Sequence, residues 1–166
     1  MGDPAGSHVI SPTQFGADPT GQQDASPAMA AAVAHLLTLG GNRTTASGLI
    51  DLGGAVLDLE GGVFLISSPV MIKSGYGNYR VQRGTLVAAP SFDNSVGEGY
   101  LLQLGDARNC NKTSGGSSNK DCTTEIGAQQ LTLDGSAVAF GGLLVQNAMD
   151  VNLGPALMVG CPSPLP

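Results

Sequence analysis

Apolar residues alternate with polar ones along most of the chain after Gly54, in short runs bounded by glycine, serine or proline. The run Leu57-Asp58-Leu59-Glu60 puts its leucines on one face and its acids on the other, which is the two-residue period of a β-strand. The same pattern predicts further strands at 63–66, 70–72, 81–87, 100–104, 131–133, 143–145 and 151–153. Their starts recur at roughly 20–24 residues, outside one polar insertion, and such periods are typical of solenoids.

One helix is predicted ahead of this region, over residues 26–39. Ser26 and Pro27 supply an N-cap and a first-turn proline, and a glycine pair at 40–41 ends the helix. Its apolar face is formed by residues at helical spacing, which are Met29, Val33, Leu36 and Leu37. Residues 1–14 are predicted to be an extended lead-in.

A short strand with one apolar face cannot bury that face alone, so each coil must stack on the next. The first coil has no predecessor, and its open edge and core need a cover. The entry loop and helix at 15–41 are the available cover. A β-sandwich could use the same strands, but the Asn-Gly turns of hairpins are absent. We therefore expect a single domain over residues 1–166, with a capped stack of coils at 54–160.

The composition favours an ordered, acidic protein. Hydrophobic residues make up 42 % of the 166 residues and charged residues only 12 %, the reverse of a disordered chain. Seven Lys and Arg against thirteen Asp and Glu give a net charge of −6, which argues against a nucleic-acid partner. No apolar run approaches the ~20 residues of a membrane-spanning helix. The first ten residues lack the basic and apolar regions of a signal peptide, so a mature region is expected.

Three segments carry a likeness to a known family: FGADPTGQQD at 15–24, GGAVLDLEGGVFLISSPVMI at 53–72 and NYRVQRGTLVAAPSF at 78–92. Together they resemble the plant polygalacturonase-like, quartet-type branch of the pectin-lyase-like superfamily, which is related to glycoside hydrolases. The resemblance runs from about Val9 to about Val159. It implies an all-β fold, a right-handed parallel β-helix with an N-terminal capping α-helix, and secretion to the extracellular space or cell wall.

The same resemblance implies hydrolysis of pectin, an α-linked galacturonan, with inversion and without a metal or other cofactor. Inversion needs an acid and a base separated widely enough for a water molecule. The family's Asn-Thr-Asp, Asp-Asp, Gly-His-Gly and Arg-Ile-Lys motifs do not occur in this chain. We therefore expect a catalytically inactive N-terminal part, with the catalytic residues after Pro166. The alternatives are a non-catalytic polysaccharide-binding or structural solenoid, and a lyase or epimerase that uses calcium.

Arg80, Arg83 and Tyr79 are the candidates for contacting a galacturonan chain. Arginine pairs carboxylates in bidentate fashion, and a tyrosine ring can pack on a sugar. Strand alternation, however, would point Arg80 and Arg83 to opposite faces. The two histidines have no partner at ligand spacing, so no metal site is predicted.

Three aspartates are predicted to be turn residues. Asp134, followed by glycine, comes directly after the strand at 131–133 and is the most tempting carboxylate for catalysis. Asp18 precedes a proline, and Asp24 stands just before the helix. An aspartate at such a place can accept hydrogen bonds from backbone amides and stay ionised, so structural roles are favoured for all three.

The cysteines and sequons agree with secretion. Cys110 and Cys122 would close a short loop as a disulfide, with Cys161 left over, although two free thiols are the alternative. Asn42 and Asn111 begin sequons in polar surroundings and are the predicted glycosylation sites.

Overall fold

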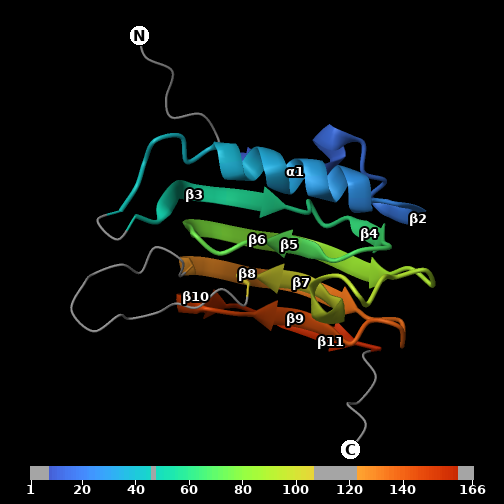
Figure 1. Ribbon diagram of the computed structural model, residues 1–166. Helices are drawn as coiled ribbons and strands as arrows, with labels where there is room; N and C mark the ends of the chain where they lie inside the picture. Colours follow the sequence, from blue (N-terminus) through green and yellow to red (C-terminus); the bar gives the residue numbers. More distant parts are fainter. Residues whose placement is uncertain (1–7, 46–47, 107–122, 161–166) are drawn as a thin grey trace, which may run out of the picture.

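The computed structural model describes residues 8–45, 48–106 and 123–160 (Figure 1). Within them the chain is mostly β-strand, with one α-helix, α1, over Ser26–Thr38. The strands are β1 (Val9–Ile10), β2 (Thr20–Asp24), β3 (Ile50–Asp58), β4 (Val63–Ile66), β5 (Val70–Ile72), β6 (Tyr76–Ala88), β7 (Tyr100–Leu104), β8 (Thr123–Asp134), β9 (Gly141–Val145), β10 (Ala148–Leu153) and β11 (Ala156–Val159). Two 3-10 helices, η1 (Pro12–Phe15) and η2 (Gly97–Gly99), complete these elements. No helix in this part of the chain is long and apolar enough to cross a membrane.

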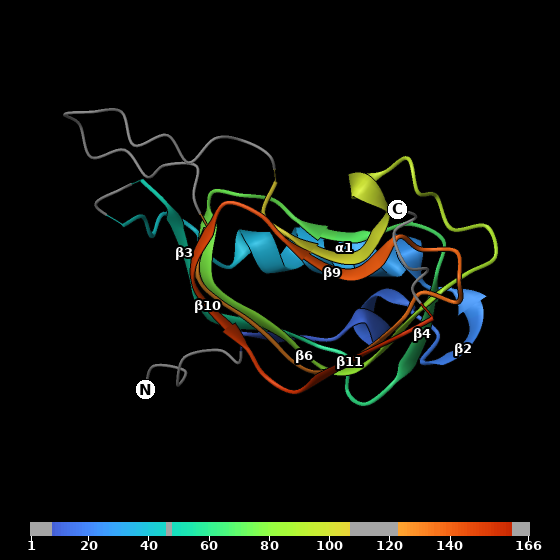
Figure 2. The same cartoon turned by 90° about the horizontal axis from the view of Figure 1, so that it is seen from below.

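Every pairing between these strands is parallel. In the larger sheet β3, β6, β8 and β10 follow one another, so that Leu57 pairs with Val81 and Val81 with Ala128. A second, three-stranded sheet has the order β5-β7-β9. Figure 2, which looks along the stack, shows the strands lying over one another around a common interior. The antiparallel strand pairs of a β-sandwich are absent from the named strands of the described residues.

Apolar side chains fill the space between the two sheets and beneath the helix. Leu57, Phe64 and Leu102 are fully buried there. The helix α1 lies over the end of the stack next to β3 (Figure 1) and buries Met29, Ala32, Val33 and Leu36. The predicted helix is therefore confirmed, with its end at Thr38 instead of residue 39. Leu37, the fourth residue of the predicted apolar face, is only partly buried.

The two-residue period locates most strands but not all of them. The predicted strands at 63–66, 70–72 and 100–104 coincide with β4, β5 and β7, and those at 81–87, 131–133, 143–145 and 151–153 are parts of longer strands. The alternating run at 57–60 is only half in a strand, because β3 ends at Asp58. The pattern misses β1, β2 and β11. β2 is polar along its whole length and mostly exposed, so no apolar period marks it.

Two predictions near the N-terminus are wrong. Residues 1–14 are not wholly extended, because η1 begins after Ser11, whose hydroxyl oxygen accepts a hydrogen bond from the N–H two residues on at 3.3 Å. Ser26 is the first helical residue and not the N-cap, which is Ala25 without a side-chain hydrogen bond. The Ser26 hydroxyl instead accepts a hydrogen bond from the Ser67 N–H at 2.8 Å and so ties α1 to the turn after β4.

Non-glycine residues in the left-handed conformation break the alternation at the corners of the stack. Asn78, Glu125 and Asp150 have φ angles of 57°, 53° and 54° and occupy equivalent places on β6, β8 and β10. Arg83, with φ of 58°, marks a second corner on β6. Each such residue costs roughly 1 kcal/mol, which the pairing on both sides must offset. The left-handed conformation of Arg83 shifts the alternation of side chains between the two faces of the sheet. Arg80 and Arg83 are therefore both exposed, contrary to the prediction that they point to opposite faces.

Candidate functional site

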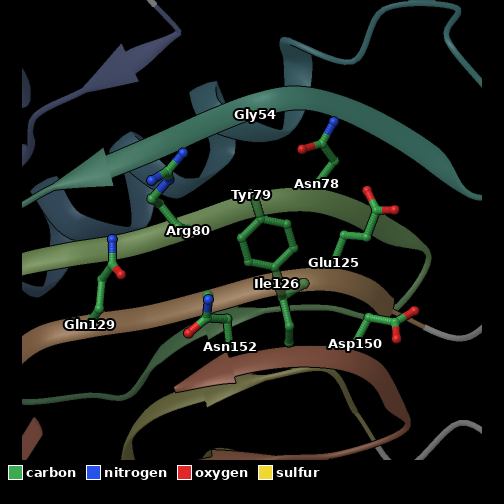
Figure 3. Close-up of a pocket in the computed structure, with 10 residues that line it drawn as sticks. Gly54, Asn78, Tyr79, Arg80, Glu125, Ile126, Gln129, Asp150 and Asn152 are labelled. Atoms are coloured by element: carbon green, nitrogen blue, oxygen red, sulfur yellow. The ribbon is translucent and has the colours of Figure 1, made fainter. Parts of the chain in front are cut away.

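A hollow of about 340 Å³ lies on the outer face of the larger sheet, across β3, β6, β8 and β10 (Figure 3). Neighbouring strands contribute its polar side chains, which are Asn78, Arg80, Glu125, Gln129, Asp150 and Asn152. One of the predicted binding residues, Arg80, therefore lines this polar hollow.

The hollow exists because a glycine stands where the adjacent strands carry outward side chains. Arg80 on β6 pairs with Gly127 on β8, and Gly127 pairs with Asn152 on β10. A Cβ atom at position 127 would lie 3.2 Å from the Arg80 Cβ and 3.6 Å from the Asn152 carbonyl oxygen. Without that Cβ, the side chains of Arg80 and Asn152 border a gap (Figure 3).

The hollow has a cationic end and an anionic end. Figure 3 shows Arg80 and Gln129 on one side, with Glu125 and Asp150 on the other. Within the described part of the chain, none of the three charged side chains makes a hydrogen bond or an ion pair. All three are therefore available to a ligand.

Two amides at the edge of the hollow already have protein partners. Asn78 Nδ2 donates to Asp51 Oδ1 at 2.8 Å, and Gln129 Nε2 donates to Gln82 Oε1 at 3.3 Å. The backbone N–H of Gly53 and the Asn78 amide hold the pKa of Asp51 below its usual value. These bonds hold both amides in place and leave the carbonyl oxygen of Asn78 free to accept.

Tyr79 lies beneath the hollow and not on its surface. Only 3 % of the residue is exposed, and its ring belongs to the core. Burial raises the pKa of the phenol, and its oxygen has no hydrogen-bond partner among the described residues. A ring buried in this way cannot pack on a bound sugar, so the role predicted for Tyr79 is corrected.

Arg83 has a structural role, because it pairs with the buried carboxylate of Asp58. Its Nε lies 3.1 and 3.0 Å from the two carboxylate oxygens of Asp58, its Nη2 also contacts that carboxylate, and Asp58 is 2 % exposed. Burial alone would raise the pKa of Asp58, but hydrogen bonds from Arg83, from Gln82 at 2.9 Å and from the Glu60 N–H at 2.8 Å hold that pKa below its usual value. Arg80 thus remains as the candidate for contacting a uronate.

The turn roles predicted for three aspartates are confirmed. Asp18 accepts hydrogen bonds from the backbone N–H groups of Thr20, Gln22 and Gln23 at 2.9–3.0 Å. Asp24 accepts one from the Ser26 N–H at 3.0 Å, and Asp134 one from the N–H two residues later at 2.8 Å. The hydrogen bonds of Asp18, led by that from the Thr20 hydroxyl, lower its pKa.

Several other predictions concern residues away from the hollow. His35 lies on the exposed side of α1, with its ring centroid 5.7 Å from that of Phe15. No group of three or more His, Cys, Asp or Glu side chains that could hold a metal ion occurs in the described ranges. Asn42 is exposed in the turn after α1. The predicted disulfide between Cys110 and Cys122, the leftover Cys161 and the sequon at Asn111 all lie outside the described residues.

A second groove, of about 400 Å³, lies between α1 and β5. Its walls are mostly apolar, with Met29, Val33 and Met71 among them, and Lys73 is the charged side chain at its edge. Because the first hollow presents both signs of charge and free hydrogen-bonding groups, it is the better candidate for a polar ligand.

Sequence reasoning misses Glu125, Gly127 and Asp150. Arg80 and its partner Gly127 stand 47 residues apart, with the polar insertion between them, so no regular period connects them. The available signal is a glycine inside a strand pattern, which often marks a place where something else approaches closely.

Part of the chain is similar in sequence to one characterised protein. No protein-family model matches it. Over 102 residues, 61 % of this chain, it is 37 % identical to polygalacturonase QRT3 of Arabidopsis thaliana, and the match spans 21 % of that protein's length. The sequence is thus polygalacturonase-like, as its motifs indicated.

Two solved structures are similar to the fold. One is the ORF18 protein of Geobacillus virus E2, with a TM-score of 0.53, 12 % identity and a match over 92 % of this chain and 26 % of the other. The second is a protein of Parabacteroides merdae provisionally assigned as a glycosyl hydrolase, with a TM-score of 0.51, 15 % identity and a match over 92 % of this chain and 75 % of the other. At these identities the likeness concerns the fold alone.

Proposed function

We propose that this chain is the N-terminal part of a secreted, pectin-degrading glycoside hydrolase, folded as a right-handed parallel β-helix with α1 as its cap. The observation that carries the proposal is the 37 % identity to a polygalacturonase. The parallel pairing supports the β-helix, because Leu57 pairs with a residue 24 positions later and Ala128 with one 25 positions later. Exposure of the sequon residue Asn42 is consistent with secretion.

In this proposal the chain caps the stack and binds substrate, while hydrolysis uses residues of the parent protein that this chain lacks. Inverting hydrolysis needs one carboxylic acid to protonate the leaving oxygen and one carboxylate to activate a water. Asp18, Asp24 and Asp134 are instead bonded to backbone amides at turns. Asp58 is bound by Arg83 inside the fold. None of these four acids lines the hollow, where it could protonate a leaving oxygen or activate a water beside a bound sugar.

The hollow around Arg80 is the proposed contact for a uronate. A guanidinium without a protein partner can bind a carboxylate through two parallel hydrogen bonds. A protein with a net charge of −6 does not attract a polyanion from a distance. Attraction must therefore be local, and Arg80 is the unpaired cation of this hollow.

The substitution Arg80→Gln should weaken binding of hexagalacturonate about tenfold, since a hydrogen bond to a charged group contributes roughly 1.5–3 kcal/mol and this one is exposed. Isothermal titration calorimetry measures the change. Lys73→Gln is the matched control, because it removes one exposed positive charge outside the hollow. Equal losses in both variants would show that only net charge matters and would contradict the assignment to Arg80.

The unaltered chain should release no more reducing ends from polygalacturonate than a heat-treated sample of the same chain does. Release above that level would show that this chain itself catalyses hydrolysis, and it would contradict the proposal that the catalytic residues lie elsewhere in the parent protein. A non-catalytic polysaccharide-binding solenoid is the second candidate, favoured by the absence of the family's catalytic motifs from the sequence. The full-length parent decides between them, because only the hydrolase should release reducing ends.

A further inference from the structure

We infer that the hollow around Arg80 selects pectin in which a free uronate stands beside a methyl-esterified one, over fully de-esterified galacturonan. This inference rests on the proposed function and adds the charge pattern of the substrate. It follows from the placement of one free cation and two free anions in the same small concave surface.

The register of the strands fixes how far apart the Cα atoms of the charged residues lie. Glu125 lies on β8 two residues before Gly127, which pairs with Arg80. Strands are about 4.8 Å apart and rise about 3.3 Å per residue, so the Cα atoms of Arg80 and Glu125 are roughly 8 Å apart along the diagonal. Asp150 takes the place of Glu125 on the next strand, β10. A ligand that reaches from the cationic end to the anionic end therefore extends over more than one strand of the sheet.

Glu125 and Asp150 lie side by side on neighbouring strands, at the same left-handed corner. Glu125 and Asp150 both have positive φ, at 53° and 54°, and both are exposed. Figure 3 shows their carboxylates on the same side of the hollow, away from Arg80. Neither has a protein partner in the described part of the chain, so both carboxylates are available to a ligand.

The chemistry of the two ends differs accordingly. The Arg80 guanidinium binds a free carboxylate. At the other end, Glu125 and Asp150 accept hydrogen bonds from sugar hydroxyls but repel a second carboxylate, since salt does not fully screen charges that come within about 8 Å, the Debye length at physiological ionic strength. A methyl ester removes that second charge without removing the hydroxyls. Complete esterification, however, would leave Arg80 without an anion.

The test compares three hexagalacturonates by calorimetry at low salt: one without esters, one with about half of its carboxyl groups methyl-esterified, and one fully esterified. The half-esterified ligand should bind about fivefold more tightly than either of the others, from charge effects of this size. In the double variant Glu125→Gln/Asp150→Asn, the unesterified ligand should gain affinity until it equals the half-esterified one. Asparagine and glutamine keep the shape of the acids, and asparagine tolerates positive φ.

A matched control and a second variant separate the possible results. Asp93→Asn/Glu98→Gln removes the same charge from exposed acids outside the hollow, one of which also has positive φ, and should leave the preference unchanged. Arg80→Gln should abolish the advantage of half over full esterification. Tightest binding of the unesterified ligand by the unaltered chain would overturn the inference and leave the proposed function standing. Binding of none of the three would overturn both.

Discussion

Replacing Gly105 by alanine should destabilise the fold by about 3–5 kcal/mol, from the combined cost of overpacking and of a side chain at positive φ. Gly105 directly follows β7 with φ of 85°, and its N–H donates to the Ile72 carbonyl oxygen at 2.8 Å. A Cβ atom there would overlap the carbonyl oxygen of Gln146, whose own N–H donates to Leu104 at 2.9 Å. Both backbones are held by the parallel ladder, so neither can move aside without breaking hydrogen bonds.

Urea denaturation followed by circular dichroism measures this loss, and Gly61→Ala is the matched control. Gly61 also has positive φ, at 76°, but nothing lies within 4 Å of the position its Cβ would take. Its substitution should cost only about 1 kcal/mol, the conformational part alone. Similar losses in the two variants would mean that the close approach of β7 to the next coil does not constrain the fold.

The features that the sequence predicts well are those that repeat locally. Alternation in the segments that became β4 and β5 depends only on which side chains enter the core, and this information is contained in a few adjacent residues. The helix at 26–38 is similar, because its buried residues recur at a fixed spacing. β7 is buried at every residue after Tyr100, and its limits are marked instead by the glycines at 99 and 105. The structure therefore confirms these strands and this helix with nearly the predicted bounds.

The candidate site is harder to predict because it depends on register and on corners. A single residue at positive φ, such as Arg83, shifts the alternation and reverses which later residues point outward. The meeting of Arg80 with Gly127 depends on how many residues the intervening coil contains. Neither effect leaves a periodic signal, so Arg80 could be named as a candidate but the acids across the hollow could not.

Arg83 illustrates the difference between a plausible residue type and an available one. Its guanidinium chemistry suits a uronate as well as that of Arg80 does. Its partner Asp58, however, is nearly inaccessible to water, and a buried carboxylate must be paired. The network continues to Gln82 and the Glu60 N–H, so the end of β3 is joined to the middle of β6 through one aspartate.

Asp58→Asn should therefore lower the free energy of unfolding by about 2–3 kcal/mol at pH 7, below the 3–5 kcal/mol of a fully buried pair, because more than half of the Arg83 side chain is exposed. The pKa of Asp58 is lowered by folding, so its contribution is present above the unfolded pKa, about 3.9, and is lost as pH falls through the folded value. The gap between the unaltered chain and the variant should thus narrow below about pH 4. Asp93→Asn, at an exposed aspartate bonded to Ser95, should leave the unfolding midpoint nearly unchanged. A gap that stays constant from neutral to acid pH would show that the shape of Asp58, and not its charge, joins the two strands.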